Sequence, residues 1–132
     1  MNIGEISKLS GVNAKLVRHY ESIGLIPKVG RSDSGYRIYS ENDAHTLKFI
    51  KRARNLGFSL PEIKQLVGLW RNRSRASAQV KSLASSHVKE LEMKISELQV
   101  MRNTLLHLVK HCHGDHRPEC PILEELEGAG QR

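Results

Sequence analysis

The chain has little cysteine, few aromatic residues and no long hydrophobic run. Of its 132 residues only two are cysteine, 5% are aromatic and 39% are hydrophobic. Two cysteines are too few for a disulfide framework and more often serve metal or redox chemistry. No stretch is apolar enough for a signal peptide or a membrane span. We therefore expect a cytoplasmic protein with no membrane partner and a modest aliphatic core, which a second chain could extend.

Positive charge is in excess and is unevenly distributed. Lys and Arg number 21 against 14 Asp and Glu, a net charge of +7. Residues 1–60 carry ten basic and five acidic groups (10 − 5 = +5), and residues 61–132 carry eleven and nine (11 − 9 = +2). A basic half favours a polyanionic partner. We expect nucleic acid at the N-terminal half, the alternative being a soluble basic surface without a partner.

The first 25 residues predict two short helices joined at Gly11, with Asn13 as N-cap of the second and Gly24 at its end. The second helix has two faces. Its polar face holds Lys15, Arg18, His19 and Ser22, and its apolar stripe holds Leu16, Tyr20 and Ile23, with Val17 at the edge. A basic face on a second short helix is typical of a helix-turn-helix, although a solvated face is the alternative.

The segment from Ile26 to Tyr39 predicts a basic hairpin. Turn residues separate two short β-prone runs, and Arg31 and Arg37 accompany Tyr36 and Tyr39. A basic hairpin after a helix-turn-helix acts as a wing that contacts phosphates.

Two more helices should follow the hairpin. Ser40–Asp43 and Ser59–Glu62 are capping boxes, each preceding an apolar helical stripe. The stripes comprise Ala44, Leu47, Ile50 and Ala53, then Ile63, Leu66 and Val67. The loop from Arg54 to Ser59 lies between them as a possible second wing.

A long helix should occupy residues 75–111. No Gly or Pro occurs from Leu69 to His113, and apolar residues recur at spacings of four and three. They are Ala84, Val88, Leu91, Ile95, Leu98, Leu105 and Val109, with an interruption at Arg102. Such a pattern predicts a coiled-coil dimer, the alternative being a helix packed on its own domain.

Both cysteines lie beyond this helix, at Cys112 and Cys120, with histidines at 111, 113 and 116. Thiolates alone favour soft ions such as Cu(I), and two sulfurs suit a monovalent ion. Histidine assistance would instead favour a divalent ion such as Zn²⁺, and a redox dithiol is a third reading. Pro121 and the apolar residues after it predict a short terminal helix, with fraying from Gly128 to Arg132.

In combination, "LVRHYESIGLIP", "RSDSGYRIYS" and "LGFSLPEI", followed by a long helix and a cysteine loop, resemble the MerR family of bacterial transcription activators. The resemblance covers essentially the whole chain. The two cysteines with seven residues between them, followed by Pro-Ile-Leu, look most like the copper-efflux (CueR-like) type.

The resemblance implies roles for individual residues. Arg18 and Tyr20 match DNA-contacting positions, and Lys15 shares their helix; Arg31, Tyr36 and Arg37 match the wing and Arg54 the second wing. Cys112 and Cys120 match the thiolate ligands of Cu(I), with Ag(I) or Au(I) as surrogates. Ser77 matches a selectivity position where divalent-metal relatives place cysteine.

The predicted fold is all-α dominated. We expect a winged helix-turn-helix DNA-binding domain at 1–70, a long antiparallel coiled-coil dimerisation helix at 75–111, and a metal-binding loop with a terminal helix at 112–127. The resemblance implies a homodimer that binds an inverted repeat in promoter DNA and distorts it for RNA polymerase, switching on copper-resistance genes. Two rivals are a DNA-architectural protein with a structural zinc clasp and a dithiol oxidoreductase, which the lack of a C-x-x-C motif disfavours.

Overall fold

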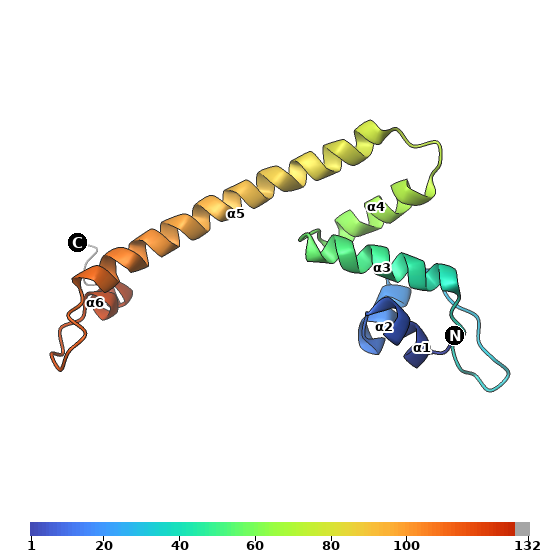
Figure 1. Cartoon of the computed structure of the whole chain (residues 1–132), viewed down its shortest axis with the longest axis horizontal. Helices are drawn as coiled ribbons and strands as arrows, with labels where there is room; N and C mark the ends of the chain where they lie inside the picture. The colour runs from blue at the N-terminus through green and yellow to red at the C-terminus, as the bar shows by residue number, and fades with distance from the viewer. Residues whose placement is uncertain (129–132) are drawn as a thin grey trace. The chain divides into compact units, whose positions relative to one another are not determined.

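The computed structural model describes residues 1–128, which form six helices (Figure 1). Their bounds are α1 Ile3–Ser10, α2 Ala14–Ser22, α3 Glu41–Asn55, α4 Leu60–Arg71, α5 Ser77–His111 and α6 Pro121–Glu127. Within residues 1–128 there is no regular strand. The predicted helix-dominated fold is therefore confirmed. The chain divides into two compact units, Met1–Ala84 and the segment from Ser85 onward.

Helices α1 and α2 are joined by a tight turn at Gly11. Gly11 has a φ of 76°, a left-handed conformation that glycine adopts without strain. The Asn13 side chain accepts a hydrogen bond from the Leu16 amide at 2.9 Å and so caps α2. Lys51 of α3 donates from Nζ to the Gly11 carbonyl at 3.1 Å. The turn is therefore fixed from both its own sequence and a distant helix.

Helices α3 and α4 begin at the two predicted capping boxes. Ser40 and Asp43 exchange side-chain and backbone hydrogen bonds at the start of α3, and Ser59 and Glu62 do the same at α4. Each box satisfies two backbone donors that a helix N-terminus leaves unpaired. Two local sequence signals thus set where both helices begin.

The core of the first unit lies among α1, α2, α3 and α4. Its buried apolar residues are Ile6, Val12, Val17, Tyr20, Leu25, Ile26, Tyr39, Ala44, Leu47, Ile50, Ala53, Ile63 and Val67. Full burial of one Val, Leu or Ile side chain contributes about 1.5–3 kcal/mol. The predicted stripe of α2 needs correction. Val17 is fully buried, whereas Ile23 is 37% exposed, because α2 ends at Ser22 and Ile23 no longer follows its helical face.

The hairpin between α2 and α3 has less strand pairing than predicted. Its two arms share one isolated antiparallel bridge, between Arg31 and Arg37. Backbone hydrogen bonds join Ser32 to Tyr36, Gly35 to Ser32 and Ile38 to Gly30, at 2.8–2.9 Å. At its base, Met1 and Tyr39 exchange two further backbone hydrogen bonds. The chain does reverse where expected, but it forms a tight turn rather than two strands.

Helix α5 is 35 residues long and begins two residues later than predicted. The turn before it delays the start, because Asn72 accepts hydrogen bonds from the backbone amides of Ser74 and Arg75. In the second unit the predicted apolar stripe of α5 is 36–61% exposed at Val88, Leu91, Ile95, Leu98, Leu105 and Val109. These side chains remain unpacked in the single chain.

Helix α6 follows the cysteine loop, as the sequence predicts. Cys120 stands at its N-cap position, and Gly128 ends it with a φ of 83°. Leu123 and Leu126 of α6 are exposed. The fraying expected at 129–132 lies outside the described residues. None of the described helices combines the length and the apolar character needed to cross a membrane.

Candidate functional site

Four side chains predicted to contact nucleic acid surround one shallow pocket in the first unit. Arg18 comes from α2, and Arg31, Tyr36 and Arg37 come from the hairpin. The rest of the wall is Asn2, Ile3 and Gly35. Guanidinium groups match phosphate oxygens in geometry and charge. The fold therefore brings together four side chains that the sequence predicts to contact DNA, from two segments that are separate in the sequence.

Arg31 and Tyr36 lie on the outer part of the hairpin. Arg31 donates from Nη1 to the Gly35 carbonyl at 3.0 Å, which orients its guanidinium along the turn. The Tyr36 side chain is 72% exposed. An aromatic ring this exposed adds little to the core, whereas a tyrosine hydroxyl can donate to a phosphate.

Arg37 is held to α2 by Glu21. Its Nε lies 3.1 Å from Glu21 Oε1, and the two side chains are 30% and 10% exposed. A carboxylate this far removed from water needs its cationic partner more than a surface pair does. Glu21 therefore links the hairpin to the helix. Sequence reasoning missed it, because the only signal was a pair of opposite charges 16 residues apart.

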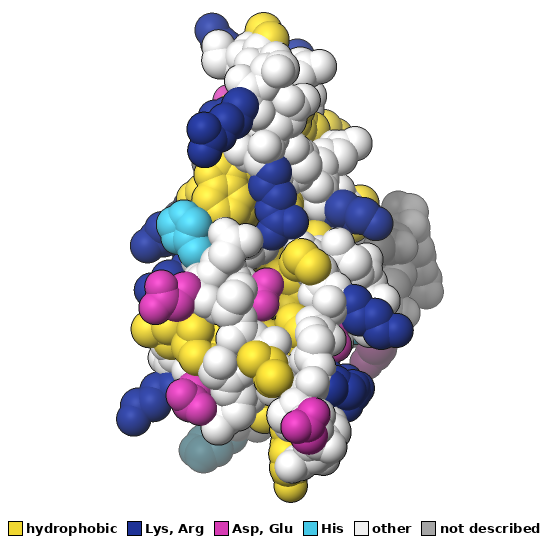
Figure 2. Space-filling view, turned by 90° about the vertical axis from the view of Figure 1, so that its right-hand side faces the viewer, with side chains coloured by type: hydrophobic (Ala, Val, Ile, Leu, Met, Phe, Trp, Pro, Cys, Tyr) yellow, Lys and Arg dark blue, Asp and Glu magenta, His cyan; other side chains and the backbone are white. Residues whose placement is uncertain are grey.

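The other predicted DNA residues divide into exposed and buried. Lys15 and Arg54 are exposed, and Arg54 lines a second pocket with Lys51 beside the α1–α2 turn. Tyr20 is only 3% exposed, so its ring belongs to the core and not to the surface that DNA would meet. Figure 2 shows Lys and Arg side chains spread over the face it presents, with Asp and Glu between them. Lys51, which lines the second pocket with Arg54, is a basic residue that the predicted DNA-binding set omitted.

The two cysteines lie together in the second unit. Cys112 directly follows α5, Cys120 directly precedes α6, and their Sγ atoms are 3.9 Å apart. Both side chains are free thiols and half-buried. Metal–thiolate bonds of about 2.3 Å allow two sulfurs to share one ion at separations up to about 4.6 Å. The pair therefore fits as a two-sulfur metal ligand set.

The surroundings favour the thiolate form of Cys120. The backbone N–H of Leu123 lowers the pKa of the Cys120 thiol most, and the Ile122 N–H and the Cys112 thiol lower it further. Partial burial and the nearby Glu124 carboxylate act in the opposite direction. The thiolate is the form in which a cysteine binds metal, so this environment favours the metal-binding form of the Cys120 side chain.

No histidine completes a larger ligand set around the two sulfurs. Within residues 1–128, no third His, Asp or Glu ligand atom lies within 4.8 Å of both. The loop has its own internal support, since Arg117 Nε donates to both Asp115 oxygens and lowers the pKa of that carboxyl. His111 makes an edge contact with His107, at 4.3 Å between ring centroids. None of the loop histidines therefore forms a three-ligand cluster with the two sulfurs.

Ser77 is the first residue of α5 and is exposed. Its hydroxyl is a harder donor than a thiolate, so this position offers no third soft ligand. The role in metal selectivity assigned to Ser77 stays a prediction.

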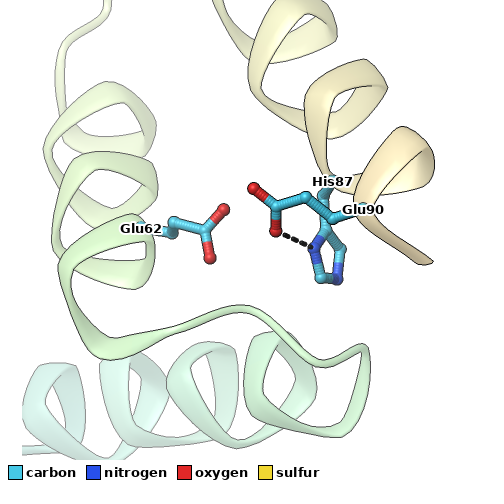
Figure 3. A group of neighbouring side chains, drawn as sticks. All are labelled: Glu62, His87 and Glu90. Atoms are coloured by element: carbon cyan, nitrogen blue, oxygen red, sulfur yellow. Dashed lines mark ion pairs between the residues drawn. The ribbon is translucent and has the colours of Figure 1, made fainter. Parts of the chain in front are cut away.

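A separate pair of ionisable groups lies one turn apart on α5. His87 Nδ1 is 3.8 Å from Glu90 Oε2, and the Glu90 side chain is 60% exposed (Figure 3). The pair carries charge on both sides only when the imidazole is protonated. It includes neither cysteine and was not predicted as a site.

Comparison with family models gives two matches that overlap. The model described as MerR HTH family regulatory protein matches residues 1–68, and the model described as MerR, DNA binding matches residues 44–108.

Known proteins match along nearly the whole chain. The regulator HmrR of Sinorhizobium medicae is 58% identical over 98% of this chain and 88% of its own. The regulator CueR of Escherichia coli O6:H1 is 42% identical over 97% and 95%. Among solved structures, the lead(II) complex of PbrR691 from Ralstonia metallidurans superposes with a TM-score of 0.82, at 34% identity over 96% of this chain and 98% of that one.

The basic pocket, the long helix with its apolar stripe and the thiol pair all occur in a chain whose relatives are regulators and not enzymes. The resemblance drawn from the sequence is confirmed. This protein belongs to the MerR family of helix-turn-helix transcription regulators.

Proposed function

We propose that the protein is a metal-responsive transcription activator that binds promoter DNA as a homodimer and senses Cu(I) through Cys112 and Cys120. The observation that carries this proposal is the thiol pair, whose sulfurs are 3.9 Å apart, with no third His, Asp or Glu ligand atom within 4.8 Å of both sulfurs among the described residues. Ag(I) and Au(I) share the charge and softness of Cu(I) and would serve as surrogates.

The donor set favours a monovalent ion. A bound metal supplies positive charge that compensates two thiolates that would otherwise repel each other. Zn²⁺ in proteins is usually bound by four ligands, and two sulfurs leave half of those positions to solvent or a partner. The similarity to CueR, at 42% identity, points the same way.

A divalent-metal sensor is the second candidate. It is favoured by the likeness to PbrR691, which was solved with lead(II). Against it stands the exposed Ser77, since the two cysteines at 112 and 120 are the only ones in the chain. A structural zinc clasp is disfavoured for the same shortage of ligands.

DNA binding rests on the pocket formed by Arg18, Arg31, Tyr36 and Arg37. In this arrangement α2 enters the major groove with Lys15 and Arg18 on its exposed face, and the hairpin contacts the adjacent phosphates. Arg54 lies in the last turn of α3, just before the second loop, and lines a pocket with Lys51; from there it would contact the DNA backbone. RNA polymerase is the partner that such a complex would serve.

Dimerisation rests on the exposed stripe of α5. Six apolar side chains from Val88 to Val109 at coiled-coil spacing leave a long hydrophobic surface on a single chain. Packing against the same helix of a second, antiparallel chain would bury it. Two DNA-binding units on one dimer match an inverted repeat in DNA.

The loop couples metal to DNA by ordering α6. Cys120 is the N-cap residue of α6, so fixing its sulfur fixes the start of the helix that carries Leu123 and Leu126. Both leucines are exposed, at 57% and 77%, and would gain burial on α5. A ligand shifts the equilibrium only by its preference for one state, and this packing supplies that preference.

Replacing Cys112 or Cys120 by Ser tests the proposal. We expect loss of metal-induced transcription with operator binding retained, because the substitution lies outside the basic unit. His113→Ala and His116→Ala are matched controls in the same loop and should leave the response intact. X-ray absorption on the Cu(I), Ag(I) and Zn(II) forms would then count sulfur neighbours. Loss of operator binding in the serine variants would contradict the proposal. So would four mixed nitrogen and sulfur ligands around Cu(I).

A further inference from the structure

The two thiols of the cysteine loop are placed so that they can bond to each other as well as to a metal. Their sulfurs are 3.9 Å apart, and a disulfide of about 2.05 Å requires them to approach by about 1.9 Å. All seven residues between them are exposed, outside any helix, and include Gly114 at a φ of 66°. Side-chain rotation and a small loop adjustment can therefore close the distance without moving α5 or α6.

Neither cysteine is enclosed in the core, since both residues are half-buried and the seven residues between them are exposed. Oxidation of cysteine follows exposure and thiolate character, and a second thiol within reach resolves the first product. Among the described residues, the thiol that lies close to each cysteine is that of the other cysteine.

We propose that hydrogen peroxide converts Cys112 and Cys120 into a reversible intramolecular disulfide, and that the oxidised chain no longer binds metal. This inference rests on the proposed function, because it concerns the same two sulfurs. The loop then reports metal only while the thiols are reduced.

The chemistry proceeds in two balanced steps. One thiolate attacks a peroxide oxygen, the O–O bond breaks, and a sulfenic acid and hydroxide form. The second thiolate attacks the sulfenic sulfur, the S–S bond forms, and hydroxide leaves. With the two thiol protons, both hydroxides become water. The sulfur pair loses two electrons, and one peroxide is reduced to two waters.

Oxidation and metal binding exclude each other because both use the lone pairs of the two thiolate sulfurs. A disulfide sulfur carries no negative charge, and it is the thiolate that acts as metal ligand. Disulfide formation leaves the basic residues Arg18, Arg31 and Arg37 chemically unchanged, and they lie in the other unit. The oxidised protein should therefore still bind its operator but ignore metal.

The test uses the full chain, reduced, freed of metal and then treated with hydrogen peroxide. Intact mass and a maleimide count of free thiols follow the reaction, and peroxide is removed before Ag(I) is titrated. Ag(I) replaces Cu(I) as the probe because peroxide would oxidise Cu(I). We expect the monomer to lose two hydrogen atoms, apart from any oxygen added at the exposed Met93 and Met101, and to lose its free thiols and its Ag(I) binding. Reduction with dithiothreitol, which is removed before the measurements, should restore the two hydrogen atoms, the thiols and Ag(I) binding.

Cys112→Ser and Cys120→Ser are the matched controls. Each keeps one cysteine sulfur, so peroxide should leave a sulfenic acid that a dimedone-type reagent labels, whereas the wild-type chain should take up no label. Two surviving thiols, a sulfinic acid or a disulfide between two chains in the wild type would overturn the inference. So would an oxidised chain that still binds Ag(I).

Failure of the proposed function gives a different result. If the reduced chain does not bind Ag(I), the metal site is wrong and the metal half of this inference falls with it. The mass and thiol count of the wild type still decide whether the disulfide forms. They do so even if a serine variant does not fold.

Discussion

Arg37 of the hairpin donates from Nε to Oε1 of Glu21 on α2, across 3.1 Å, and the Glu21 side chain is only 10% exposed. A carboxylate thus lies beside the basic pocket that we propose as the DNA-binding surface. A negative charge there opposes phosphate binding unless its effect on the position of Arg37 outweighs the repulsion. Removing the charge of Glu21 should therefore strengthen DNA binding if repulsion dominates, and weaken it if the position of Arg37 matters more.

We expect Glu21→Gln to weaken operator binding, by about tenfold, because Arg37 loses its charged partner and the hairpin its link to α2. Fluorescence anisotropy at fixed ionic strength measures the affinity. Asp33→Asn is the matched control, since it removes a negative charge from the exposed hairpin turn and should strengthen binding slightly. Tighter binding by Glu21→Gln would show that charge alone matters and that the positioning role is wrong.

Leu98→Asp should dissociate the dimer. Leu98 lies on the apolar stripe and is 61% exposed in the single chain, so a carboxylate there would be buried between two chains. Val100→Asp introduces the same charge at a position that is 65% exposed but off the stripe. Sedimentation equilibrium should give a monomer for the first variant and a dimer for the second. A dimer in both would place the interface elsewhere.

Metal affinity should fall as pH falls, because protons compete for both thiolates. Because the pKa of Cys120 is lowered, this loss begins at a lower pH than for a thiol of ordinary pKa, and the release of two protons per metal limits the slope to about a hundredfold per pH unit. Competition with a chelator, at several values between about pH 5 and pH 8, records this profile. The Glu124 carboxylate raises the pKa of Cys120, so Glu124→Gln should move the profile to lower pH. No shift, or a shift upward, would contradict this account of the site.

Tyr39→Phe should leave the fold intact or stabilise it by up to about 1 kcal/mol. The Tyr39 side chain is 2% exposed, and its hydroxyl is buried without a hydrogen-bond partner among residues 1–128. Burial, and then Glu21, raises the pKa of Tyr39, so the neutral form is the one that folds. Thermal unfolding measures the change, with the exposed Tyr36→Phe as a control that should not shift the midpoint. Destabilisation by more than about 1 kcal/mol would reveal a partner for the hydroxyl.

The sequence predicted best what depends on neighbouring residues. Asn13, Ser40 and Ser59 cap helices where expected, because a capping side chain reaches only the next turn of its own backbone. The stripes of α3 and α5 followed from helical spacing for the same reason.

What depends on folding was harder to predict. The exposure of Ile23 depends on where α2 ends, and the Glu21–Arg37 ion pair depends on the path of the hairpin. Periodicity carries neither kind of information. For the cysteine loop, the spacing and the family resemblance predicted a shared site, whereas the structure supplied the 3.9 Å separation and showed that no histidine ligand atom lies within 4.8 Å of both sulfurs.

The division at Ala84 separates two chemistries that have no residue in common. Every basic side chain of the proposed DNA surface precedes it, and both thiols follow it. A cellular biosensor could therefore be retuned by exchanging only the loop from Cys112 to Cys120. The promoter driving its reporter would need no redesign, because the segment that reads it would be untouched.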